Sequence, residues 1–92
     1  MDPRDPKRHE LRTRTDKQRT ARAVAAEEEA RANARAEREL DDPDGWAHDV
    51  VEFNQRIDAM RADIERLPGG WDAEAQAAYE QARAEYAQER AA

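Results

Sequence analysis

Large apolar residues follow a regular pattern in the second half of the chain. From residue 46 onward, seven of them are separated alternately by four and three positions. They are Trp46, Val50, Phe53, Ile57, Met60, Ile64 and Leu67. This spacing places the side chains on one face of an α-helix, and it is typical of a face that packs against another helix. We call these seven residues the apolar stripe and predict that they form the contact face of one helix.

Proline and glycine mark both ends of this predicted helix. Pro43 suits the first turn, because its missing N–H has no helical partner there and its φ is already helical. Pro68 ends the helix, since it restrains the preceding residue and cannot donate a helical hydrogen bond. Gly69 or Gly70 can take the positive φ that a sharp reversal between helices commonly needs. The sequence therefore predicts a turn over residues 68–71.

A further helix is predicted after this turn, with Asp72 as its capping residue. Small and aromatic residues share one of its sides: Trp71, Ala75, Ala78, Tyr79, Ala82 and Tyr86. The alanines allow close approach of two backbones, and Trp71 can fill the closed end of the turn. We therefore predict that residues 42–92 form an antiparallel two-helix hairpin, coiled-coil-like in its packing and stable without the residues before it.

Residues 1–41 have a different character. Between Lys7 and Asp42 there is neither proline nor glycine, so a helix is expected at least in part. The only large apolar residues in this segment are Met1, Leu11, Val24 and Leu40. They are too sparse to form a stripe. The segment is predicted to be a charged, Ala/Arg-rich helical arm, either solvated along its length or ordered by a partner.

Composition supports an all-α protein with a small core. Charged residues make up 41% of the 92 residues, hydrophobic residues 38%, and 20 residues are alanine. Such a chain favours helices over a sheet. A hairpin of about 50 residues buries little apolar surface, so it should pack against a second copy, a partner or its own first segment. Self-association into four helices is the simplest of these arrangements.

The net charge of −6 is unevenly distributed. Residues 1–22 carry eight basic and four acidic residues, whereas the rest of the chain is acidic. The basic residues of this segment are Arg4, Lys7, Arg8, Arg12, Arg14, Lys17, Arg19 and Arg22. Three interpretations stay open: a solvated charged helix, an arm that binds an acidic protein surface, and a nucleic-acid contact. No aromatic residue lies among them for base stacking.

Residues suited to catalysis or metal binding are scarce. The chain has no cysteine and no serine, and its two histidines are His9 and His48. His48 and Glu52 have i,i+4 spacing, but no third ligand accompanies them. We predict no catalytic residue, no metal site and no cofactor, and therefore no enzyme. The N-terminus lacks the apolar run of a signal peptide, and no stretch is long enough to span a bilayer, so a cytoplasmic protein without membrane contact is expected. Export without a cleaved signal and a viral particle are the alternatives.

The order of helix, tryptophan-containing turn and aromatic helix points to a known family. Trp71 lies in the turn, and Tyr79 and Tyr86 follow on the next helix. In these features residues 44–90 resemble the Trp-x-Gly helical-hairpin proteins of type VII secretion. The resemblance implies an antiparallel helical hairpin that pairs with a partner of similar size.

The sequence as a whole favours a non-catalytic helical adaptor or assembly component that acts through protein–protein contacts. A small part of a larger particle, such as a phage assembly or a secretion apparatus, would have this composition. A type VII secretion hairpin protein and a nucleic-acid-binding regulator are the two alternatives.

Overall fold

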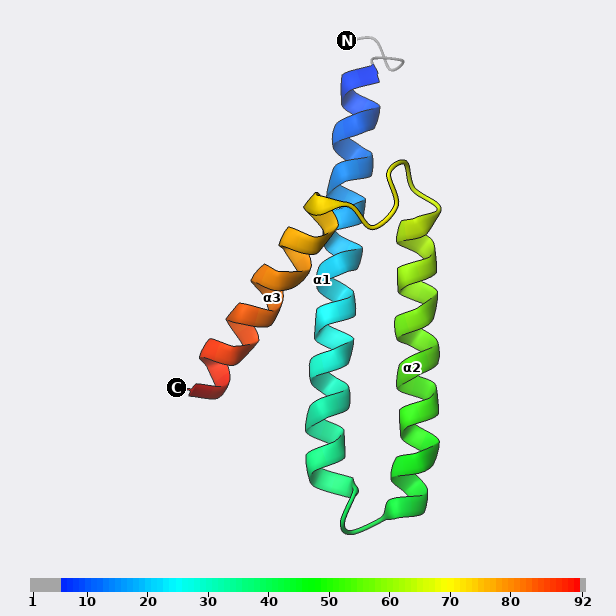
Figure 1. Cartoon of the computed structure of the whole chain (residues 1–92), viewed down its shortest axis with the longest axis vertical. Helices are drawn as coiled ribbons and strands as arrows, with labels where there is room; N and C mark the ends of the chain where they lie inside the picture. The colour runs from blue at the N-terminus through cyan, green and yellow to red at the C-terminus, as the bar shows by residue number, and fades with distance from the viewer. Residues whose placement is uncertain (1–5, 92) are drawn as a thin grey trace.

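The computed structural model describes the backbone of residues 6–91 and the side chains of residues 14–91. Within that range it contains three α-helices and no strand: α1 at Pro6–Arg38, α2 at Pro43–Glu65 and α3 at Ala73–Ala91. The predicted all-α class is confirmed. Figure 1 shows that α1 occupies the middle of the molecule, with α2 returning alongside it and α3 slanting away on the other side.

The helices are paired differently from the prediction. α1 packs against both α2 and α3, and in the described chain no Cα atom of α2 lies within 8 Å of a Cα atom of α3. The antiparallel hairpin predicted for residues 42–92 is therefore not confirmed. The antiparallel pair consists instead of α1 and α2, joined by the short turn between Arg38 and Pro43 (Figure 1).

The first segment supplies part of the core instead of forming a separate arm. Ala21, Val24 and Ala25 of α1 are all 0% exposed. Alanines let the neighbouring backbones come close, and the single valine fills the space between them. The prediction overlooked this face because small side chains do not stand out in a sequence that is rich in alanine throughout.

The limits of α2 follow from local chemistry. The Asp42 side chain caps the helix, accepting a hydrogen bond from the Gly45 N–H at 3.0 Å, and Pro43 opens the first turn. The helix ends at Glu65, and the N–H of Arg66 still bonds to the carbonyl of Ala62 at 3.2 Å. Pro68 follows closely and prevents further helical bonding.

The segment between α2 and α3 contains both residues with positive φ in the described chain: Gly69 at 84° and Gly70 at 57°. A β-carbon at Gly70 would also lie 2.7 Å from a carboxylate oxygen of Glu65. The left-handed conformation disfavours any residue with a side chain. These two glycines let the chain leave α2 and cross over to α1 instead of folding back along α2.

Alanine at either glycine is expected to destabilise the protein. The left-handed backbone should cost about 1–2 kcal/mol for each substitution, Gly69→Ala and Gly70→Ala. Arg66→Ala is the control, because Arg66 has a φ of −78° and an exposed side chain. Its cost should stay below about 0.5 kcal/mol. Urea denaturation measures all three, and equal midpoints for the glycine variants and the control would contradict the described turn.

The main core is small and lies near the α2–α3 end of the molecule. It joins Ala21 of α1, Ile64 of α2 and Ala75 and Ala78 of α3, with Trp71 and Tyr79 packed against it. The overall shape is elongated, with extents of 57 × 30 × 21 Å and a radius of gyration of 16.4 Å. A compact chain of this length has a radius of gyration of about 12 Å. Much of the molecule therefore lies away from its core.

Candidate interaction surface

The apolar stripe of α2 is only partly buried in the chain. Ile57 is 5% exposed and Ile64 is 0% exposed. The other five residues are half-buried: Trp46, Val50, Phe53, Met60 and Leu67. The stripe was predicted to face α3, but α1 is the helix that packs along α2. Ile64, near the far end of the stripe, also joins the core that includes Ala75 and Ala78 of α3. α1 alone does not fully cover the bulky side chains of the apolar stripe.

Burial is absent from one whole end of the molecule. No residue from Ala30 to Arg56 is buried, although this stretch contains Trp46, Val50 and Phe53. α1 offers only alanine, asparagine and charged side chains here. α3 ends beside Glu29, which pairs with Arg90 at 3.3 Å. The last turns of α1 and the first half of α2 thus form a two-helix end without a third helix.

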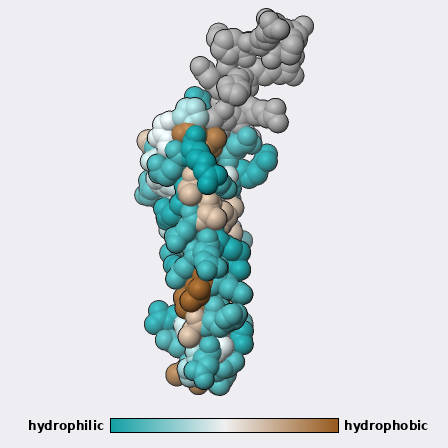
Figure 2. Space-filling model, turned by 90° about the vertical axis from the view of Figure 1, so that its right-hand side faces the viewer, coloured by the Kyte–Doolittle hydropathy of each residue, from teal (hydrophilic) through white to brown (hydrophobic). Residues whose placement is uncertain are grey.

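Two further apolar residues lie at this end. Leu40 in the turn is 91% exposed and Val51 of α2 is 52% exposed. Figure 2 views the molecule from the α2 side and shows apolar residues as a narrow brown and tan line between hydrophilic ones. We call the apolar residues of residues 30–56 the turn-end patch: Leu40, Trp46, Val50, Val51 and Phe53.

Beyond the two-helix end, Glu28 of α1 links the three helices. Its carboxylate lies 3.1 Å from Arg61 of α2 and 3.4 Å from Arg83 of α3, and it accepts a hydrogen bond from the Tyr79 hydroxyl. Burial, followed by this hydrogen bond and the charge of Glu28, raises the pKa of Tyr79. The carboxylate thereby ties all three helices together.

Aromatic rings cover this ionic cluster. The Arg61 guanidinium lies 4.6 Å from the centroid of the Trp71 ring, and Trp71 meets Tyr79 edge-on at 5.7 Å between centroids. Both arrangements are favourable for aromatic rings. Trp71 therefore closes the junction of the helices: it contacts Arg61 of α2 and Tyr79 of α3 and packs against the main core, although α2 and α3 do not form the predicted hairpin.

Lys17, one of the basic residues predicted as possible partner or phosphate contacts, is buried. Its side chain is 4% exposed, and its Nζ donates to the Pro68 carbonyl at 2.6 Å and to Asp72 Oδ2 at 2.8 Å. Asp72 also caps α3 by accepting from the Ala75 N–H at 3.1 Å. The hydrogen bond from Lys17, followed by that from Ala75, lowers the pKa of Asp72. Lys17 thus fastens the α2–α3 segment to α1.

This lowered pKa makes acid sensitivity a testable property. A carboxyl whose pKa is lower in the folded state stabilises the fold above its unfolded pKa of about 4, and the contribution is lost as pH falls through the folded pKa. Thermal melts from pH 7 to pH 2 should show stability falling below about pH 4. Asp72→Asn should be less stable at pH 7 and decline less steeply in acid. Asp58→Asn is the control, since Asp58 has no described partner, and its profile should follow the parent. An Asp72→Asn profile as steep as the parent's would contradict the described interaction between Lys17 and Asp72.

The other basic residues of the first segment differ in their surroundings. Arg14 pairs with Glu74 at 3.0 Å, and Arg22 pairs with Glu85 at 2.5 Å, so both hold α3 against α1. Arg19 is largely exposed and lies 3.9 Å from Asp16. The remaining residues of the predicted basic set have side chains outside the described part of the chain: Arg4, Lys7, Arg8 and Arg12.

Charges in the described side chains are paired unequally. Every lysine and arginine from residue 14 to 91 has an acidic partner except Arg31, which donates to Asn54 at 2.6 Å. Several carboxylates have no described partner: Glu37, Asp41, Asp44, Asp58 and Glu89. The unpaired charge of the described surface is therefore negative.

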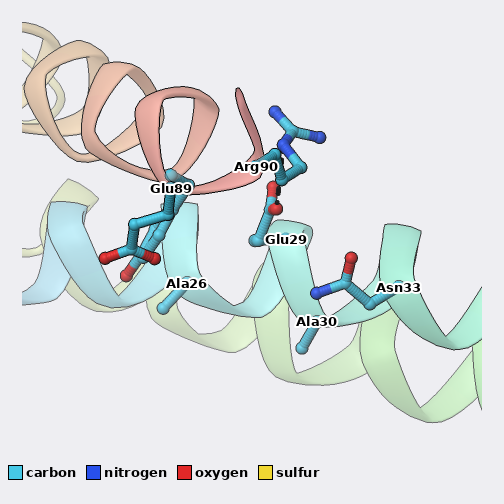
Figure 3. Close-up of a pocket in the computed structure, with 7 residues that line it drawn as sticks. Ala26, Glu29, Ala30, Asn33, Glu89 and Arg90 are labelled. Carbon is cyan, nitrogen blue, oxygen red and sulfur yellow. Dashed lines mark ion pairs between the residues drawn. The ribbon is translucent and has the colours of Figure 1, made fainter. Parts of the chain in front are cut away.

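A wedge-shaped hollow with a volume of about 410 Å³ lies between the last turns of α3 and α1. Figure 3 shows Glu29 of α1 and Arg90 of α3 facing one another across it, with Ala26 and Ala30 along the α1 side. Tyr86, predicted for the seam, lines this wedge. The wedge forms where α3 diverges from α1. Small alanine side chains on α1 leave the space open, and the Glu29–Arg90 ion pair spans it.

The described residues lack the features of a metal site and of a membrane span. No three His, Cys, Asp or Glu side chains in them gather as a metal site would require. His48 and Glu52 approach to 3.4 Å on the exposed side of α2. None of the described helices has both the length and the apolar character needed to cross a membrane.

Sequence reasoning missed the α1 residues that organise the fold. Val24 and Glu28 are four positions apart and Ala21 precedes Val24 by three, so these residues share one helical face with Lys17 and Ala25. Counting alanine as a contact residue would have revealed this face.

No family model, no curated protein and no solved structure matches the chain.

Proposed function

We propose that this protein is a non-catalytic helical adaptor or assembly component that binds another protein chain through the turn-end patch. The α2–α3 end supplies the fold, and the α1–α2 turn end supplies the contact. A second copy and a different protein are both partners within this proposal, and a larger particle is a fitting place for either.

One observation supports this function most directly: no residue from Ala30 to Arg56 is buried, although this stretch carries Trp46, Val50 and Phe53. Aromatic residues contribute strongly to protein interfaces because they bury large areas at low entropic cost. The large apolar side chains that are buried in the described chain are Val24, Ile57 and Ile64, all outside residues 30–56. A partner that covers the turn-end patch would give these side chains the burial that α1 alone does not provide.

The two alternative functions have less support from the described residues. A nucleic-acid contact needs unpaired cations to neutralise phosphates, whereas Arg14, Lys17 and Arg22 are engaged within the chain. The type VII secretion resemblance implies an antiparallel hairpin around Trp71, whereas α2 and α3 do not pack along one another. The sequence also has Ala73 where that family's motif has glycine.

Site-specific photocrosslinking tests the proposed function. A benzophenone amino acid replaces Phe53 in the turn-end patch, and in a second protein it replaces Ala84 on the exposed side of α3. After irradiation of cells that express each variant, Phe53 should give covalent adducts larger than the 10.6 kDa monomer, and Ala84 should give far fewer. Absence of adducts at Phe53, or equal yields at both positions, would overturn the proposal.

A further inference from the structure

We propose that the partner of the turn-end patch contributes a basic amphipathic α-helix, which lies along α1 and α2 as their missing third helix. The inference rests on the proposed function and narrows it to one class of partner. Two independent features of residues 30–56 support it: the geometry of the uncovered helix pair and the sign of its unpaired charges.

The geometry calls for a helix. α3 occupies the side of α1 as far as Glu29 and then ends, while α1 continues to Arg38 and α2 begins at Pro43 (Figure 1). The uncovered stretch of α2, residues 43–56, is about 21 Å long at 1.5 Å per residue. A partner helix of about four turns matches this length, and its apolar face would cover Trp46, Val50 and Phe53.

The charges call for a basic partner. Residues 30–56 contain four basic and seven acidic side chains. All four basic groups are engaged: Arg31 with Asn54, Arg35 with Glu39, Arg38 with Asp42 and Asp49, and Arg56 with Glu27. Glu37, Asp41 and Asp44 have no described partner and flank Leu40 in and beside the turn. Lysine or arginine on the polar face of the partner helix would pair with these carboxylates.

The same charges disfavour a second copy as the occupant. In a two-fold dimer each copy contributes the same patch, so the interface would hold both sets of three unpaired carboxylates and no unpaired cation from residues 30–56 to balance them. Like charges brought together in an interface are destabilising, whereas a basic helix gains attraction both on approach and when bound. A heterologous basic helix therefore fits the turn-end patch better than this chain does.

Two synthetic peptides test this assignment against the full-length protein. Each is an amphipathic helix of about 16 residues, roughly four turns, with leucines on one face; the polar face is lysine in one and glutamate in the other. Fluorescence anisotropy should give at least about tenfold tighter binding for the lysine peptide at 0.15 M salt, where charges within about 8 Å still interact. Equal binding of the two peptides would overturn the assignment.

Charge variants locate the binding and exclude a general attraction to an acidic protein. The triple variant Glu37→Gln, Asp41→Asn, Asp44→Asn should bind the lysine peptide at least about tenfold more weakly. The control Asp58→Asn, Glu89→Gln removes unpaired carboxylates elsewhere and should bind within about twofold of the parent. An equal loss in both variants would show non-specific attraction and overturn the assignment.

Light scattering and the photocrosslinked adducts separate this inference from the proposed function. A concentration-dependent dimer that the triple charge variant strengthens would identify a second copy as occupant, overturning the basic-helix assignment while leaving the adaptor function intact. A Phe53 adduct whose partner peptide is basic and helical would support both. Failure of the lysine peptide together with absence of Phe53 adducts would overturn both.

Discussion

Removing α1 should unfold the rest of the chain. A fragment of residues 41–92 retains the whole apolar stripe and α3, but it lacks the helix against which both of them pack. Isolated helices of this length are marginal in water. We expect the helical signal per residue, measured by circular dichroism at 222 nm, to fall to less than about half that of the full chain, without a cooperative thermal transition.

Adding the removed α1 segment back as a separate peptide provides the control. A peptide of residues 1–40, mixed with the fragment, should restore helicity and a cooperative melt, because it supplies Ala21, Val24, Ala25 and Glu28. A peptide with Val24→Asp and Ala25→Asp should fail to do so, since each change places a charge in the buried face of α1. A fragment of residues 41–92 that melts cooperatively alone would show that α2 and α3 form the originally predicted hairpin.

Ile64→Asp is expected to be the most damaging single substitution. Ile64 is 0% exposed and connects the α1 and α3 sides of the main core. Losing the buried isoleucine costs about 2–3 kcal/mol, and the unpaired charge adds several more. A chain of this size has a total stability of about 5–14 kcal/mol, so the variant should be largely unfolded or close to its unfolding midpoint at 25 °C.

Two related variants keep this prediction open to contradiction. Val51→Asp introduces the same side chain at a residue that is 52% exposed, and it should cost less than about 1 kcal/mol. Ile64→Val removes one methylene and should cost about 0.5–1.5 kcal/mol in urea denaturation. Similar stability losses for the aspartate variants at Ile64 and Val51 would mean that α2 does not face the core as described.

The cluster around Glu28 illustrates what a linear pattern conveys poorly. Glu28, Arg61 and Arg83 are charged residues in a chain that is 41% charged, and nothing in their local sequence distinguishes them from the solvated residues beside them. They meet because α2 and α3 approach α1 from two sides. Lys17 is a similar case. The positive charge of its segment was compatible with a binding arm, whereas the folded chain buries Lys17 against Asp72 and the Pro68 carbonyl.

Local chemistry in the sequence by itself determined where the helices begin and end. Asp42 and Pro43 start α2, Pro68 and the following glycines separate it from α3, and the 4-3 spacing identifies the side of α2 that meets another helix. These features depend on interactions between residues a few positions apart, so a linear reading can find them.

Only the tertiary structure decided which helices are partners. The apolar stripe is compatible with any neighbouring helix of suitable width, and the sequence favoured the next one along the chain. The structure pairs α2 with α1 because Ala21, Val24 and Ala25 allow close packing, and because the positive-φ glycines carry the chain across to the other side of α1. With this pairing, α1 and α2 contact only each other over residues 30–56. The turn-end patch therefore arises from the packing of the whole chain and not from any one motif.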